Sequence, residues 1–142
     1  DDVGRHDEAL VLFREIHARR VAVHGLLHEH TIITGTNLAC SLSSSKLWDE
    51  SRSFLLDQLL PAAHQSLGAD HDLTLKGKRI LADTHVLNPK HTRDDILEAE
   101  TIIQDVIQRR RRVFGPAHPQ THDAEQALSL VREKLAQPVG LA

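Results

Sequence analysis

Histidine is the residue whose number and spacing most readily suggest chemistry in this chain. There are 11 His residues, and His24, His28 and His30 lie close together in the sequence. Imidazole nitrogens at such spacing can coordinate zinc. His28, however, belongs to a pattern that recurs along the chain, described below, which favours a structural role. We therefore expect no metal site.

Cys40 is the one residue that could serve as a thiol nucleophile. A nucleophilic cysteine needs a base beside it. The neighbours expected on the same helix are Thr36, Asn37, Ser43 and Ser44, and none of them is a base. The sequence also has no Walker motif, no glycine-rich phosphate loop and no paired metal-ligating helix motif. We expect neither an enzyme nor a cofactor.

A run of four arginines at 109–112 could bind phosphate or act in nuclear import. Four consecutive side chains on a helix fan around its axis and cannot all face one partner. The run also falls at the expected C-terminal end of a helix, where positive charge is stabilising. We interpret it as a solvated cluster that offsets the helix dipole.

Composition excludes several classes of protein. The formal net charge of −3 gives no overall attraction to nucleic acid or to an anionic membrane. No apolar run is long enough to cross a bilayer. A single Cys cannot form an internal disulfide and fits a reducing compartment, so we expect a cytoplasmic location. The chain contains no Met even at position 1, so we expect it to be a piece of a longer protein.

An internal repeat carries most of the information. One phrase recurs with identical spacing, as Gly25–His28–Thr31, Gly68–His71–Thr74 and Gly115–His118–Thr121. Seven residues after each Thr stands a Leu followed by a small residue. Each Gly follows a long apolar-periodic segment and is expected to end a helix in the left-handed conformation, at positive φ. Each His-to-Thr stretch is expected to open the next helix.

These signals predict an all-α chain with helices near 5–24, 29–44, 46–67, 71–87, 93–114 and 119–136. The first helix should bury Ala9, Leu12, Phe13, Ile16 and Val23, and the fifth a similar face from Ala99 to Phe114. The third helix contains Pro61 and one more residue than its counterparts, which predicts a kink or bulge. Thr92 with Asp95 predicts a capping box.

The phrase Gly-x-x-His-x-x-Thr followed by Leu and a small residue resembles the tetratricopeptide repeat of kinesin light chains. The resemblance runs from about residue 4 to residue 136. It implies a right-handed superhelix of about three antiparallel helix pairs, forming a single array over residues 1–142. Such arrays are non-enzymatic scaffolds that hold another protein. The pattern departs from the family where Ile80 and Ala127 stand in place of the usual Asn.

The resemblance also implies a binding surface, because the shorter first helix of each repeat lines the concave face of such an array. The positions carried over by their offset from each Leu are Ile33, Thr36, Asn37, Cys40, Lys76, Arg79, Ile80, Asp83, Asp123, Gln126, Ala127 and Leu130. Among these we select Thr36, Asn37, Cys40, Lys76, Arg79, Asp83 and Gln126 as partner-binding residues. Asn37 is the strongest candidate, because its amide can both donate to and accept from a peptide backbone.

Lys76 and Arg79 are three residues apart and share a helix face. With Asp83 pairing to Arg79, they would leave one net positive charge in the groove, which predicts an acidic or phosphorylated extended partner. Two alternatives remain. The array is a spacer or an oligomerisation segment, or it regulates a catalytic domain outside this sequence. The sequence does not indicate an oligomeric state.

Overall fold

The computed structural model describes residues 2–137, so the outermost residues of the predicted 1–142 array lie outside it. The described residues form helices joined by short links and contain no strand. The elements are α1 (Asp2–His24), α2 (Glu29–Ser44), α3 (Trp48–Phe54), η1 (Leu55–Leu59), α4 (Leu60–Leu67), α5 (Asp72–Leu87), α6 (Arg93–Phe114) and α7 (Pro119–Ala136). The predicted all-α fold is confirmed. None of the described helices is both long and apolar enough to span a membrane.

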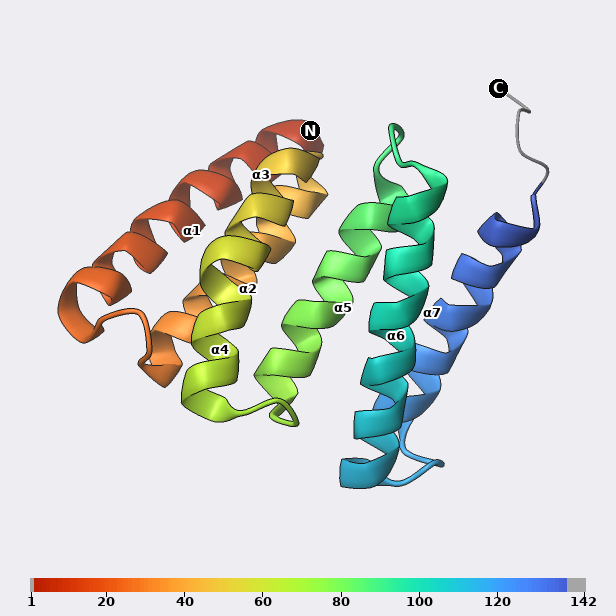
Figure 1. Cartoon of the computed structure of the whole chain (residues 1–142). Helices are drawn as coiled ribbons and strands as arrows, with labels where there is room; N and C mark the ends of the chain where they lie inside the picture. The colour runs from red at the N-terminus through yellow and green to blue at the C-terminus, as the bar shows by residue number, and fades with distance from the viewer. Residues whose placement is uncertain (1, 138–142) are drawn as a thin grey trace.

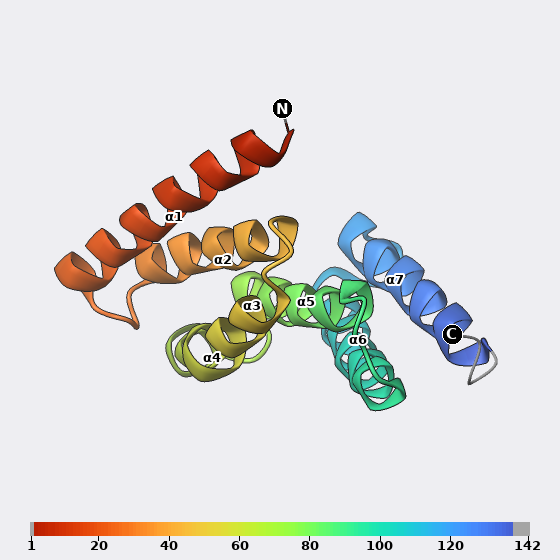
Figure 2. The ribbon, with the colours of Figure 1, turned by 90° about the horizontal axis from the view of Figure 1, so that it is seen from above.

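The helices are arranged as an array in which consecutive elements lie side by side (Figure 1). Seen from above, α2, α5 and α7 follow one another, with the continuous α3–η1–α4 segment and α6 on one side of them and α1 on the opposite side of α2 (Figure 2). We call α2, α5 and α7 the inner row, and α1, the α3–η1–α4 segment and α6 the outer helices. Each outer helix therefore packs on the inner helices next to it. The inner row is the concave side on which a binding surface was predicted.

Three helices begin in the same way, at the histidine of the repeated phrase. His28, His71 and His118 are the N-caps of α2, α5 and α7, with almost identical extended backbone angles. In each case the imidazole Nδ1 accepts a hydrogen bond of 3.1 Å from the backbone N–H two residues on. This bond satisfies one of the free N–H groups of the first helical turn. Thr92 and Asp95 form the predicted capping box that opens α6.

The glycines of the phrase end the outer helices at positive φ, as predicted. The φ angles are 81° at Gly25, 93° at Gly68 and 88° at Gly115. The predicted left-handed conformation is nevertheless wrong at Gly68 and Gly115. Their ψ angles are 166° and 163°, an extended conformation that is essentially confined to glycine. The chain thereby turns sharply from each outer helix to the next inner one.

A π-helical turn interrupts the third long helix just before Pro61. It spans Leu55–Leu59, and the N–H of Leu60 donates to the carbonyl of Leu55, five residues back. This is the bulge predicted from the extra residue. Ser51 and its counterpart Ala99 are both 0% exposed although Ser51 lies one residue farther from its glycine. The π turn therefore absorbs the insertion and returns the helix to register.

The core is aliphatic, as the composition predicted, but two predicted faces are wrong in part. In α6 the apolar face from Ala99 to Ile107 is buried between α5 and α7, but its predicted extension to Val113 and Phe114 is wrong, since these side chains are 49% and 37% exposed. In α1 the side chains of Leu12, Ile16 and Val23 are 57%, 42% and 74% exposed. Helix α1 instead buries Leu10 against α2. Among the described helices, α1 packs mainly on α2 alone, so only one flank of it is covered.

Candidate functional site

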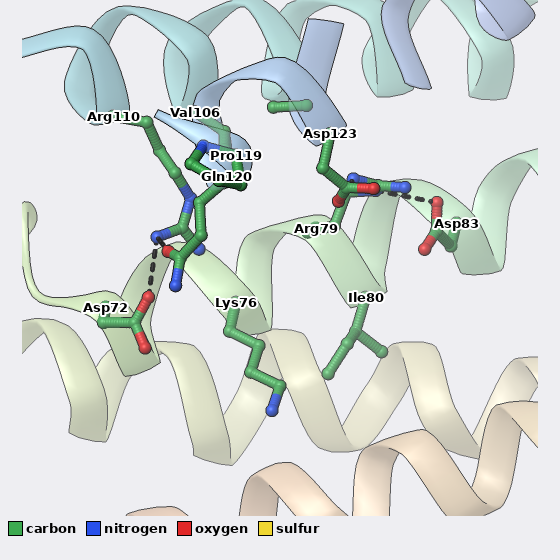
Figure 3. A pocket seen from close by; sticks show the side chains of 11 residues that line it. Asp72, Lys76, Arg79, Ile80, Asp83, Val106, Arg110, Pro119, Gln120 and Asp123 are labelled. Atoms are coloured by element: carbon green, nitrogen blue, oxygen red, sulfur yellow. Dashed lines mark hydrogen bonds and ion pairs between the residues drawn. The ribbon is translucent and has the colours of Figure 1, made fainter. Parts of the chain in front are cut away.

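A cleft of about 470 Å³ lies on the inner row between α5 and α7, with α6 at its back (Figure 3). Helix α5 contributes its residues from Asp72 to Asp83, and the first turns of α7 form the opposite wall. Val106, Ile80, Pro119 and Ala124 provide apolar patches between the charged groups. We refer to this space as the α5–α7 cleft.

Most charged groups of the α5–α7 cleft are held in ion pairs. Arg79 bridges the two walls, donating to Asp83 on its own helix at 3.2 Å and to Asp123 on α7 at 2.8 Å. Arg110 is only 7% exposed and donates to Asp72 at 2.6 Å. Lys76 forms no hydrogen bond or ion pair with any residue in the described range 2–137, and its side chain points away from α7 (Figure 3). Lys76 is thus the available cation of the cleft.

The predicted net positive charge of the groove is wrong. The prediction counted Lys76, Arg79 and Asp83, whereas the structure adds Asp72, Asp123 and Arg110 to the lining. Three cations and three carboxylates then balance. Sequence offset alone missed Asp72 and Arg110, because one stands at the first position of α5 and the other on the neighbouring outer helix.

Comparison with known proteins supports a tetratricopeptide repeat in one part of the chain. Residues 90–120 match the family model of the tetratricopeptide repeat. The matched segment covers the end of the α5–α6 link, all of α6 and the first turn of α7. No curated protein matches the chain. Tetratricopeptide repeats are generally non-catalytic modules that mediate protein–protein interaction.

Within this tetratricopeptide-like array, the predicted partner-binding residues fall into three groups. Lys76, Arg79 and Asp83 line the α5–α7 cleft. Asn37 and Gln126 are exposed on the inner helices but do not line it. Thr36 is a correction, since it is 2% exposed and its hydroxyl donates to the carbonyl of Ile32 at 2.8 Å. Its side chain is consequently not accessible to a partner.

Cys40 lies on α2 next to the mouth of the cleft, close enough to Lys76 and Asp83 to feel their charges. Burial raises the pKa of its thiol, Lys76 lowers that pKa, and Asp83 raises it. The thiol is therefore protonated at neutral pH and a weak nucleophile. Asp83 is itself partly buried, and this burial raises the pKa of its carboxyl group, an effect that Arg79 opposes.

The arginine run 109–112 is solvated only in part, because Arg111 and Arg112 are exposed whereas Arg109 is half-buried and Arg110 is buried. The four side chains do point in different directions. Arg109 contacts Asp70 and Asp105, Arg110 contacts Asp72 and Gln120, Arg111 contacts Glu125, and Arg112 lies 4.0 Å from Asp70. These pairs connect α6 to the neighbouring α5 and α7 and to the turn before α5. The run therefore stabilises the joints of the array.

The rings of the three histidines around the first turn contact one another, with His24 stacked on His28 and His30 edge-on to both. Their ring centroids are 4.3 Å apart for His24 and His28 and 4.9 Å apart for His28 and His30. One nitrogen of His28 is already used in capping α2. Over residues 2–137 this triad does not form a set of three convergent ligand atoms. A different set, His85, Asp95 and Glu98, does.

Proposed function

We propose that the inner face of this array docks an extended segment of another protein, and that the α5–α7 cleft receives it. The observation that carries the proposal is the cleft of about 470 Å³ on the concave row, with an unpaired lysine at its mouth. The general role of tetratricopeptide repeats in protein–protein interaction supports it. The recurring Gly–His–Thr phrase leads us to infer, in addition, that the array is of the kinesin-light-chain kind.

The partner's chemistry follows from Lys76. Because Arg79 and Arg110 already have carboxylate partners, an incoming peptide gains little by pairing with them. Lys76 has no such partner among residues 2–137, so one acidic or phosphorylated side chain can pair with it without displacing a contact described there. The apolar patches beside it fit a small aliphatic neighbour in the peptide. We therefore propose a single acidic anchor and not a generally acidic segment.

Asn37 extends the proposed surface on α2. Its amide is exposed on the inner row and can bond to a peptide backbone without requiring a particular side chain. We expect the two helices to act together, with α2 holding backbone and α5 holding the acidic anchor. The lining offers few apolar hot spots, so we expect micromolar affinity, on the order of −8 kcal/mol.

A peptide array with single acidic residues placed along neutral sequences tests this proposal. Lys76→Glu should weaken the best binders about tenfold and should invert the preference for an acidic residue at one position. Added salt should weaken binding to the wild-type protein. The matched control is Lys90→Glu, which makes the same charge change on the exposed link between α5 and α6, outside the cleft.

An equal loss of peptide affinity in Lys76→Glu and Lys90→Glu would show a non-specific charge effect and would contradict docking in the cleft. Unchanged binding in both variants would place the partner elsewhere.

Self-association is the competing function. The charged lining of the cleft does not favour pairing between copies, and sedimentation of the protein across a concentration series checks it. A dimer abolished by Lys76→Glu would support the oligomerisation alternative instead.

A further inference from the structure

His85, Asp95 and Glu98 come together where the last turn of α5 meets the first turns of α6. The Nε2 atom of His85 lies 3.4 Å from Oε2 of Glu98, and its Nδ1 atom lies 4.0 Å from Oδ1 of Asp95. Asp95 and Glu98 are three residues apart on α6 and so share one helix face. In the described part of the chain, this is the one set of three potential ligand residues whose donor atoms all lie within 4.8 Å of one another.

The imidazole of His85 has an unsatisfied nitrogen. The residue is 3% exposed, and its buried Nε2 atom has no hydrogen-bond partner within residues 2–137. A buried polar atom without a partner is costly. Burial lowers the pKa of His85, with Arg52 acting in the same direction and the two carboxylates opposing it. A neutral imidazole has only one N–H, so one of its nitrogens directs a lone pair towards a carboxylate oxygen.

The two carboxylates are placed as ligands with an open outer side. The Oδ2 atom of Asp95 accepts the backbone N–H of Thr92 at 2.9 Å, which leaves Oδ1 turned towards His85. A ligating carboxylate is commonly oriented by such a second hydrogen bond. The side chains of Asp95 and Glu98 are 27% and 47% exposed, so an ion and its water ligands can reach the imidazole from solvent.

We propose that His85, Asp95 and Glu98 form a binding site for a divalent metal ion, and that this ion is Zn²⁺. One imidazole nitrogen and two carboxylate oxygens are ligand types that zinc accepts, and water completes the tetrahedron. The ion takes the imidazole lone pair and neutralises the two carboxylates. It thereby removes the unsatisfied contact at the centre of the triad.

Zinc at this site acts as a structural tie. The link between α5 and α6, residues 88–92, joins an inner helix to the outer helix behind it. A metal bound by both helices holds that joint and the start of α6, and α6 forms the back of the α5–α7 cleft. The nearby positive charge of Arg52 opposes the ion, so the affinity should rise when Arg52 is replaced by Gln.

Zinc titration by calorimetry tests the site, with Co²⁺ absorption reporting its geometry. The titration uses the full chain carrying His24→Gln and His30→Gln, so that the histidine cluster at the first turn cannot bind the added zinc. We expect one equivalent of Zn²⁺ to bind and to raise the unfolding temperature. Adding Glu98→Gln should weaken this binding by about tenfold or more. Glu133→Gln is the matched control. Glu133 is an exposed residue of α7, and its replacement should leave the zinc affinity unchanged.

The proposal is overturned if the background protein binds no zinc, or if Glu98→Gln binds it as tightly as that background. Loss of binding in Glu133→Gln to the same extent as in Glu98→Gln would also overturn it. Glu98 is about half exposed, so its replacement by Gln is not expected to unfold the chain. Circular dichroism of each variant before titration checks that the helices are intact.

Discussion

The three glycines of the repeated phrase share one structural role, and its three histidines share another. Each glycine ends an outer helix at positive φ, and each histidine caps the inner helix that follows. The imidazole takes the place of the Ser, Thr, Asp or Asn side chain that usually accepts the backbone N–H. Because these interactions are local, they set the turn independently of what the helices pack against.

Gly68→Val should lower the free energy of unfolding by about 1–2 kcal/mol. With φ at 93° and ψ at 166°, a β-branched residue is strained there. A Cβ atom at Gly68 would meet nothing within 4 Å, so the cost comes from the backbone alone. Urea denaturation measures it.

Ala69→Val is the matched control for this backbone effect. It introduces the same side chain at the next residue of the turn, where φ is not positive. We expect a change within about 0.5 kcal/mol, as for most surface substitutions. Equal stability of Gly68→Val and the wild type would mean that the turn adopts an ordinary backbone conformation in solution.

At the scale of elements, the π turn explains how one helix tolerates an insertion. An extra residue in a regular α-helix rotates everything beyond it by about 100°. In the third long helix the extra residue is confined to Leu55–Leu59, so both Ser51 on one side and Ala63 on the other remain buried. Pro61, which has no N–H to donate, follows directly after this turn.

Deleting Asp57 should therefore be tolerated, because it removes the exposed extra residue and restores the spacing of the other repeats. We expect a loss of less than about 2 kcal/mol in stability. Gln104 is an exposed residue of α6, a helix that has no π turn to absorb the deletion of a residue. Its deletion would turn Ile103 away from Val106 and Ile107 and should cost more than about 4 kcal/mol. Thermal unfolding of the two deletion variants compares them, and similar losses would contradict the role given to the π turn.

For the whole molecule, stability depends on neighbouring helices in the row. One core cluster joins Ile32 and Ala39 of α2 and Leu59 of the π turn to Ile80 and Leu81 of α5. Within residues 2–137, the two main core clusters each draw on more than two elements, which is the behaviour expected of a repeat array. The conformation of the cleft depends in the same way on how α5, α6 and α7 pack.

A truncated chain that ends at Gly68 should be markedly less helical per residue than the full chain. It lacks α5, so the cluster around Leu59 loses Ile80 and Leu81. A chain that ends at residue 88 is the control, since it retains α5 and should keep the helicity of the first helices. Circular dichroism compares the three lengths. Equal helicity per residue in all of them would indicate independent helical bundles.

Local signals in the sequence determined the helices and their ends. The predicted inner-helix bounds 29–44 and 119–136 agree with the structure to the residue, and the bulge before Pro61 was predicted from a single extra residue. Caps, positive φ and helical periodicity depend on residues within a few positions of one another. The sequence therefore contains them completely, and the all-α repeat follows from their threefold recurrence.

The binding surface, by contrast, was decided by tertiary structure. The spacing from the repeated Leu placed Lys76, Arg79 and Asp83 at the cleft. It could not show that Asp123 pairs with Arg79 or that Thr36 is buried. It also gave no sign that His85 meets Glu98 across the α5–α6 joint. These contacts depend on the angles and distances between helices. Such geometry results from the packing of whole faces, and no spacing within one helix encodes it.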